Sequence, residues 1–283
     1  MADQPIRWGR ILIISLSGIV SHTFARTSLA VLVSAMGDEL RLSGTVTGAL
    51  GSVNLGSYLL GVVVVTFIAG RVEPFVLLRS GIVIVAVGLA VLGTASSTPQ
   101  VVVGTALSGL GGAGIWLTAP IIASENVPPA RRGAVLSSLS ATMGAAAIGV
   151  PIAATGLREL VSDAGAWRQV WLAECVLTVA LLILLSKLIH PETTDRVEGR
   201  FAFGSLRKLK GWRPAVGAYM SFAFVAAAFA LFIAPSLEGD HGFSRNHTTL
   251  LFSVVGAGSM IGSLALGRLG DHWGRPRTMT LAM

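Results

Sequence analysis

The chain alternates long apolar runs with short polar segments along nearly its whole length. Apolar runs that reach the roughly 20 residues needed to cross a bilayer lie at about 11–35, 46–69, 75–95, 100–123, 134–156, 167–189, 214–236 and 248–267. This pattern predicts eight transmembrane helices and, near the C-terminus, the start of a ninth. We therefore expect an all-α, polytopic membrane protein that is embedded in a lipid bilayer.

Basic residues gather in alternate polar segments. If the N-terminus is cytoplasmic, sixteen Lys and Arg residues fall on inside segments, and only Arg41, Arg158, Arg168 and Arg245 fall outside. Cytoplasmic loops carry such an excess of positive charge. The sequence therefore predicts a multi-pass protein of the cytoplasmic (inner) membrane with its N-terminus in the cytoplasm.

Composition and charge agree with a membrane protein and exclude other classes. The chain is 53% hydrophobic and only 12% charged, and its formal net charge is +7. In a soluble protein this charge would suggest nucleic-acid binding, but here the basic residues stand in short loops, so we expect no nucleic-acid partner. Cys175 is the single cysteine, so neither an intrachain disulfide nor a cysteine cluster for a metal is expected. Phosphate loops, nucleophile elbows and metal-ligand spacings are not seen, and we expect neither a cofactor nor an enzyme.

A glycine-punctuated basic stretch, 267–277, follows the eighth apolar run. It matches the pattern G-x-L-x-D-x-x-G-R-x-R at Gly267, Leu269, Asp271, Gly274, Arg275 and Arg277. This pattern resembles the loop signature of the major facilitator superfamily of membrane transporters. In that family the signature forms a cytoplasmic turn between the second and third helices of each six-helix half. We expect a tight turn over this whole stretch, since the glycines permit it.

The resemblance implies a division into two halves, because complete members of the family have twelve helices as two repeats. Residues 1–189 would form the six-helix N-terminal half, 190–213 a cytoplasmic linker, and 214–283 an incomplete C-terminal half with helices seven, eight and the start of nine. The loop 70–74 occupies the equivalent place after the second run. It is either an eroded copy of the signature or a plain charged turn with a helix-starting proline.

The resemblance also implies a gate. The segment 128–133, with Arg131 and Arg132, is similar to the family's cytoplasmic entry to helix five. In relatives, the acid of the second-half signature meets that helix start and helps to hold the cytoplasmic gate shut. Carried over, Asp271 would meet the start of helix five near Gly133. The alternative is that Asp271 caps only its own loop.

Arg26 is a charged residue deep inside the first apolar run, and His22 lies one helical turn before it. An intramembrane arginine is costly unless it faces a cavity or a partner. Because the first helix lines the pathway in this family, we expect both side chains to line the substrate cavity, with Arg26 binding an anionic group. The alternative is that Arg26 snorkels or forms a structural ion pair.

Two further positions follow from a resemblance to a branch of bacterial permeases in this superfamily. The residues Phe24-Ala25-Arg26, with Met36, are followed in the second run by Asn54-Leu55-Gly56-Ser57-Tyr58-Leu59-Leu60-Gly61. Asn54 and Tyr58 lie one turn apart and are candidates for binding substrate. The sequence favours the alternative for both, a structural hydrogen bond to a neighbouring helix.

Glu174 is the second charge at membrane depth, in the sixth run. It is a candidate for coupling transport to an ion, either by pairing with Arg26 or by accepting a proton.

Glycines punctuate the fourth and eighth runs. Those of the fourth run predict close helix approach, and for Trp116 there we expect a packing role. Gly258 and Gly262 in the eighth run have the small-xxx-small spacing that favours packing within the molecule.

Together these features predict a secondary active transporter. It would move a small solute, for which Arg26 favours an anion, by alternating access, with a proton or another ion as the coupling partner. The alternatives are a truncated, non-transporting remnant of such a permease and a membrane sensor.

Overall fold

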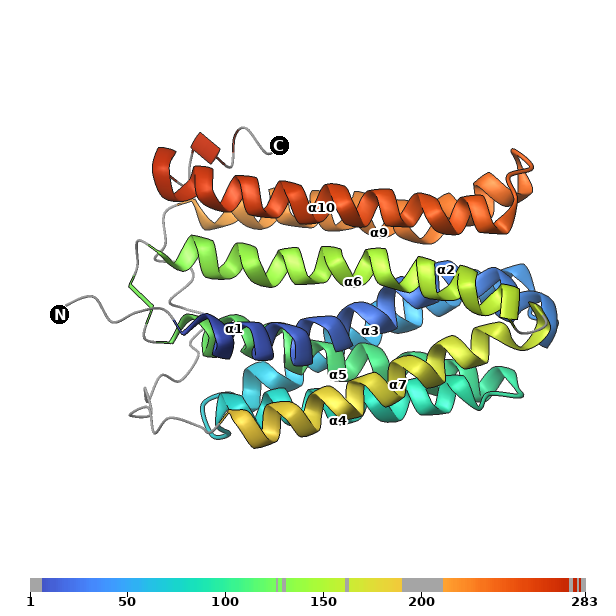
Figure 1. Ribbon diagram of the computed structural model, residues 1–283, viewed down its shortest axis with the longest axis horizontal. Helices are drawn as coiled ribbons and strands as arrows, with labels where there is room; N and C mark the ends of the chain where they lie inside the picture. The colour runs from blue at the N-terminus through green and yellow to red at the C-terminus, as the bar shows by residue number, and fades with distance from the viewer. Residues whose placement is uncertain are drawn as a thin grey trace.

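The protein is a bundle of long helices aligned along one axis (Figure 1). The structure, a computed structural model, describes residues 7–125, 127–128, 131–160, 163–189, 211–274, 277–278 and 280. The first membrane span runs from Trp8 to Leu40. The helices after it are α3 (Gly44–Ile68), α4 (Pro74–Gly93), α5 (Thr98–Ser124), α6 (Arg132–Leu160), α7 (Asp163–Leu188), α9 (Trp212–Gly239) and α10 (Arg245–Trp273). Within the described residues, seven spans, all but α9, are long and apolar enough to cross a membrane.

The first span has three parts, α1 (Trp8–Ile14), the π-helix η1 (Ser15–Val20) and α2 (Ser21–Leu40). The helix continues without a break through η1, where the backbone hydrogen bonds follow the i→i+5 pattern of a π-helix. Such turns are rare and often mark functional sites. The span ends where Arg41 adopts a left-handed backbone conformation with φ 52°.

Helix ends follow local chemistry. Ser43 and Ser244 precede α3 and α10, and each side chain accepts a hydrogen bond from a backbone N–H in the first turn. Pro74 stands in the first turn of α4, where its missing N–H costs nothing. The loop 70–74 is thus a short turn that ends in a helix-starting proline.

The prediction of a turn over the whole of 267–277 was wrong. α10 continues as a helix to Trp273, and the turn begins only at Gly274, whose φ is 85°. The backbone is helical again at Arg277, Thr278 and Thr280. Arg275 lies outside the described residues, as do residues 190–210 of the predicted linker.

Glycines bring α4 and α5 into backbone contact, as the fourth apolar run predicted. A Cβ atom added at Gly81 would lie 2.7 Å from the carbonyl oxygen of Gly111. One added at Gly88 would lie 2.8 Å from that of Gly104. Both are closer than real Cβ contacts, so only glycine allows the two helices to approach this far.

The last two helices join the bundle mainly through α10, which packs along α6, while α9 touches α10 and α2 (Figure 1). At the α6–α10 crossing, a Cβ added at Gly256 would lie 2.9 Å from the carbonyl oxygen of Gly144. At Gly258 and Gly262 an added Cβ would meet nothing within 4 Å. The prediction that Gly258 and Gly262 pack within the molecule was therefore wrong, and Gly256 makes the close contact with α6 instead.

The bundle has two ends, which we call the near end, with Trp8, and the far end, with Leu40. At the near end Arg10 and Glu125 form an ion pair at 3.4 Å between α1 and the residue after α5. At the far end Glu39 of α2 accepts hydrogen bonds from Arg168 and from Trp167 Nε1, the latter at 2.6 Å. The first span is thus fastened to its neighbours at both ends.

Candidate functional site

Arg26 is the exposed residue in a stretch of α2 that is otherwise buried. From Val20 to Val33, every other residue is buried except Thr27, which is intermediate. A lipid-facing stripe would also expose the neighbours of Arg26 one turn away on either side. His22 and Ala30, which occupy those positions, are buried. Arg26 therefore opens into a local space of its own rather than onto a lipid-facing stripe.

Aromatic rings surround the turn that carries Arg26. Its guanidinium carbon lies 5.9 Å from the centroid of the Tyr58 ring, within cation–π range. The His22 ring lies between Tyr58, at 5.9 Å, and Trp116 of α5, at 5.8 Å, measured between ring centroids. We call Arg26, His22, Tyr58 and Trp116 the aromatic box. Three of its members were candidates from sequence, and the structure brings them together.

Trp116 is the member that sequence reasoning missed, because we expected it only to pack. A signal for it exists one turn earlier on the same helix. A Cβ atom added at Gly112 would lie 2.5 Å from His22 Nδ1, so glycine there lets α5 approach the histidine. Gly112 and Trp116 share a helix face, and that face holds the imidazole ring.

Asn54 makes a structural contact instead of facing the box. Its side-chain amide is buried and donates a hydrogen bond of 3.2 Å to the backbone carbonyl of Thr105 on α5. At the same level, an added Cβ on Gly109 would collide with the Asn54 carbonyl oxygen. Of the two interpretations of Asn54, the structure favours the interhelical hydrogen bond.

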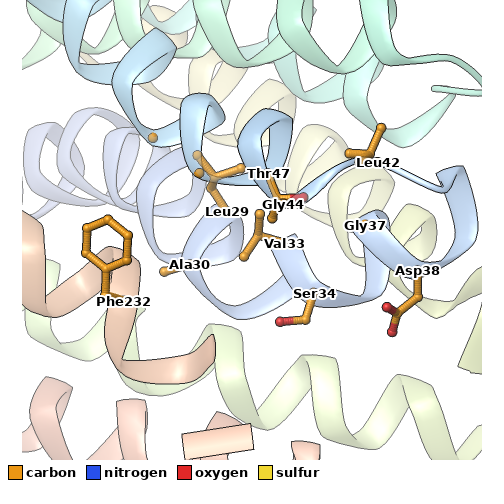
Figure 2. Close-up of a pocket in the computed structure, with 12 residues that line it drawn as sticks. Leu29, Ala30, Val33, Ser34, Gly37, Asp38, Leu42, Gly44, Thr47 and Phe232 are labelled. Carbon is orange, nitrogen blue, oxygen red and sulfur yellow. The ribbon is translucent and has the colours of Figure 1, made fainter. Parts of the chain in front are cut away.

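A cavity of about 360 Å³ lies on the far-end side of the box, and none of the four box residues lines it. Figure 2 shows that its walls come from α2 and α3, with Phe232 of α9 facing them. On α2 the lining includes Ala30, Val33 and Gly37, which continue the row of Arg26 at helical spacing. On α3 it includes Thr47 and Gly51, on the row that ends at Tyr58. Its lining residues are Leu29, Ala30, Val33, Ser34, Gly37, Asp38, Leu42, Gly44, Thr47, Gly48, Gly51 and Phe232.

Glu174 lies on the opposite side of α2 from the box. It is 6% exposed and accepts a hydrogen bond from the Ser28 hydroxyl. Ser28 is two residues from Arg26, which is about 200° around a helix of 3.6 residues per turn. The predicted alternative in which Glu174 pairs with Arg26 was therefore wrong, since α2 separates the two charges.

At the near end, Asp271 meets the start of α6. Its Oδ2 accepts a hydrogen bond of 3.1 Å from the backbone N–H of Ala134, and its carboxylate occupies the space where a Cβ on Gly133 would lie. A carboxylate there stabilises the unpaired N–H groups and the positive end of the helix dipole. The contact expected from the resemblance is present, and its role as a gate stays a prediction.

The other residues of the predicted gate differ in their contacts, and among those described only Gly267 packs closely across the α6–α10 junction. Gly267 packs on Ser137 of α6, where a Cβ atom would collide with the hydroxyl group. Arg131 and Arg132 are exposed, and Arg132 Nε donates a hydrogen bond of 3.2 Å to the Val127 carbonyl oxygen. Gly274 and Arg277 are exposed beyond the end of α10.

The described residues hold no group of three or more His, Cys, Asp or Glu side chains that could bind a metal ion. The candidate site comprises an aromatic box with one cation, a cavity on its far-end side, and a contact between α6 and α10 at the near end. These features define a polytopic helical membrane protein with a candidate solute-binding site among its helices.

The chain belongs to the Major Facilitator Superfamily, whose family model matches residues 15–283. Among curated relatives, an uncharacterised MFS-type transporter of Mycobacterium tuberculosis is 30% identical over 169 residues, which are 56% of this chain and 25% of the relative. The putative transporter AraJ of Escherichia coli is 24% identical over 223 residues, or 76% of this chain and 55% of AraJ.

Solved structures share the fold at low sequence identity. A bacterial homologue of the human lysosomal transporter Spinster, in an inward-facing conformation, has a TM-score of 0.74 and 19% identity, covering 98% of this chain and 64% of that chain. A D-xylose–proton symporter has a TM-score of 0.69 and 15% identity, and the match covers 95% of this chain and 70% of the symporter chain. The chain therefore spans less than two thirds of the Spinster homologue and a smaller share of the curated relatives above.

Proposed function

We propose that this protein is a secondary active transporter that moves a small organic anion across the cytoplasmic membrane by alternating access. The observation that carries the proposal is the aromatic box. Arg26 supplies one fixed positive charge beside aromatic faces, and apolar surroundings strengthen its attraction for an anion. A carboxylate on a planar ring suits both features, because the carboxylate can accept from the guanidinium while the ring packs on aromatic side chains.

The cavity and the near-end contact support alternating access. The cavity lies between the level of the box and the far end, while Asp271 and Gly267 hold α10 against α6 at the near end. A transporter that is closed at one end and hollowed toward the other is in one of the two states that alternating access requires. In the other state the α6–α10 contact at the near end would open.

The orientation of the protein is part of the proposal. The two ends carry very different numbers of basic residues, and the positive-inside bias assigns the near end to the cytoplasm. The cavity would then face the outside and receive solute from there.

Binding of benzoate to the purified protein in liposomes tests the substrate class. Benzoate combines a carboxylate with a planar ring, and cyclohexylammonium is the comparison ligand of opposite charge. We expect radiolabelled benzoate to bind to the wild-type protein. Arg26→Ala should lower the affinity for benzoate by about tenfold or more, because a charge-assisted hydrogen bond is worth roughly 1.5–3 kcal/mol.

Two variants sharpen that test. Arg26→Lys keeps the charge and should retain most binding, whereas Arg71→Ala, in an exposed turn between α3 and α4, should leave it unchanged. Preference for cyclohexylammonium, or benzoate binding that ignores Arg26→Ala, would refute the proposal.

A further inference from the structure

A row of buried polar groups runs between the first span and α7, away from the aromatic box. Ser17, Ser21 and Ser28 are each 0% exposed. Ser17 Oγ donates a hydrogen bond of 3.0 Å to the Leu181 carbonyl oxygen of α7, and Ser28 Oγ donates one to Glu174 Oε1. Ser21 Oγ donates 2.6 Å to the Ser17 carbonyl. The three hydroxyls lie close to one line along the helix, since they are spaced by four and seven residues.

The facing surface of α7 carries polar atoms that lack partners. Trp171, Glu174 and Thr178 are spaced by three and four residues and share one helix face. Trp171 Nε1, Glu174 Oε2 and Thr178 Oγ1 are buried, and none has a hydrogen-bond partner among the described residues. We call these three residues and the three serines the polar seam. Buried polar groups nearly always have a hydrogen-bond partner, so three polar atoms without one on the same helix face require an explanation.

The polar seam and the aromatic box occupy different faces of one helix. Arg26 and Ser28 point about 200° apart around α2, by the helical repeat of 3.6 residues. Glu174 is also near the middle of α7, where an ionised carboxylate without a cation would be costly. A neutral, protonated carboxyl there is far less costly.

We propose that the polar seam is a proton site and that Glu174 is the proton carrier that couples transport to a proton gradient. The inference rests on the proposed transport function and names its coupling ion. In the state described here, the proton is on Glu174 Oε2, the oxygen without a partner, while Oε1 accepts from Ser28. Glu174 takes this proton from a hydronium ion at one membrane face, leaving water, and returns it to water at the other.

The composition of the seam favours a proton over a metal cation. Sodium, magnesium and calcium ions need several oxygen ligands at once. Glu174 is the one carboxylate of the seam, and the described residues offer no cluster of acids around it.

No cation faces Glu174 from the helices that pack against α7, so its charge has no fixed counter-ion among the described residues. The charged and titratable side chains on α7 and on those helices engage other groups or stand on other faces or at helix ends: Arg10, His22, Arg26, Asp38, Glu39, Arg79, Arg132, Arg168, Cys175 and Lys187.

Coupling follows from the two faces of α2. Loss of the proton would leave an unpaired negative charge between α2 and α7, which favours a movement that admits water to the seam. Because Ser28 and Arg26 stand on one continuous helix, that movement also displaces Arg26 and the box. Protonation and solute binding are thereby linked through one helix.

Infrared difference spectroscopy of the full chain in liposomes tests the proton directly and needs no substrate. We expect the carbonyl band of a protonated carboxyl at pH 7, its loss in Glu174→Gln, and its retention in Glu39→Gln, which removes a carboxylate at the far end of α2. Ser28→Ala should raise the frequency of the same band, since Oε1 loses its hydrogen bond. The band should also shift on transfer to heavy water, because a carrier must exchange its proton with solvent.

The outcomes separate this inference from the transport proposal. Identical carboxyl bands in the wild type and Glu174→Gln would overturn it, as would a Glu174 band that never exchanges with heavy water. If Glu174→Gln does not fold, the wild-type exchange and the Ser28→Ala shift decide the question in its place. Arg26→Ala should leave the band intact, so failure of benzoate binding and failure of the proton site are distinguishable.

Discussion

At the scale of single residues, this protein handles polar groups in apolar surroundings in three ways. Arg26 remains exposed to a local space, which avoids the roughly 2.5–3.5 kcal/mol that a charge at the centre of a spanning helix costs on insertion scales. Asn54 is buried and satisfied by the Thr105 carbonyl. Glu174 is buried with one oxygen satisfied and one open. Only the satisfied group has a purely structural explanation.

Asn54→Ala should therefore affect stability and spare binding. The variant loses the hydrogen bond between α3 and α5, and such bonds within membrane bundles are worth about 0.6–1.7 kcal/mol. Thermal unfolding in detergent should show a modest decrease of the midpoint, while benzoate affinity stays within about twofold, since Asn54 does not face the box. A large loss of affinity at unchanged stability would instead place Asn54 in the binding site.

At the scale of elements, close approach of helices depends on particular glycines. α4 and α5 meet through Gly81 and Gly111, and α6 meets α10 through Gly144 and Gly256. Without a hydrophobic driving force between helices in lipid, packing contacts of this kind hold the elements together. α10 also carries much of the connection between the last two helices and the rest of the bundle.

Gly256→Ala should loosen the junction of α6 and α10, because the added methyl group would lie 2.9 Å from backbone atoms of Gly144 and Ala147. Overpacking of this kind costs about 1–3 kcal/mol. Gly258→Ala is the matched control, since its methyl group meets nothing within 4 Å. Thermal unfolding and the rate of limited proteolysis of the two variants check the difference, and equal behaviour would contradict the assigned contact.

At the scale of the whole molecule, the two ends of the bundle are in different states. At the near end the Asp271 contact joins α6 and α10, and a cavity lies toward the far end. α9 exposes large apolar side chains along much of its length, including Tyr219, Phe222 and Phe224. Among the described elements, α10 and α2 are the ones that pack closely against α9.

Asp271→Asn should favour opening of the near end, since the neutral amide stabilises the α6 N-terminus less than a carboxylate, by about 0.3–1 kcal/mol for the charge. A cysteine at Ser137, in a Cys175→Ser background, reports on this opening because Ser137 packs under Gly267. An impermeant maleimide should label it several times faster in Asp271→Asn, and only in inside-out vesicles if the near end is cytoplasmic.

Asp240→Asn, at the far end, is the control and should not change the labelling rate. Labelling from right-side-out vesicles would reverse the proposed orientation, and a rate insensitive to Asp271→Asn would remove the carboxylate from the gate.

The hydrophobic pattern alone determined the class of protein, the approximate limits of the long helices, and which polar segments share an end. It predicted eight complete spans, whereas seven of the described spans are long and apolar enough to cross a membrane. It also placed His22 with Arg26, and Asn54 with Tyr58, because residues one turn apart on a helix must be neighbours. These are local properties, set by the bilayer thickness and the helical repeat. Turn chemistry was less informative, since the glycine-rich stretch after the eighth run stays helical to Trp273.

Only the tertiary structure decided which faces of distant helices meet. In the tertiary structure Trp116 lies beside the His22 ring, and Glu174 accepts a hydrogen bond from Ser28 instead of pairing with Arg26. Gly256, and not Gly258, makes the contact with α6. Helical spacing assigns side chains to a face, but the partner of that face depends on how ridges, glycine gaps and buried polar groups of separate helices fit together. That fit involves residues far apart in the sequence, such as Ser28 and Glu174, which are 146 positions apart, and no local pattern encodes it.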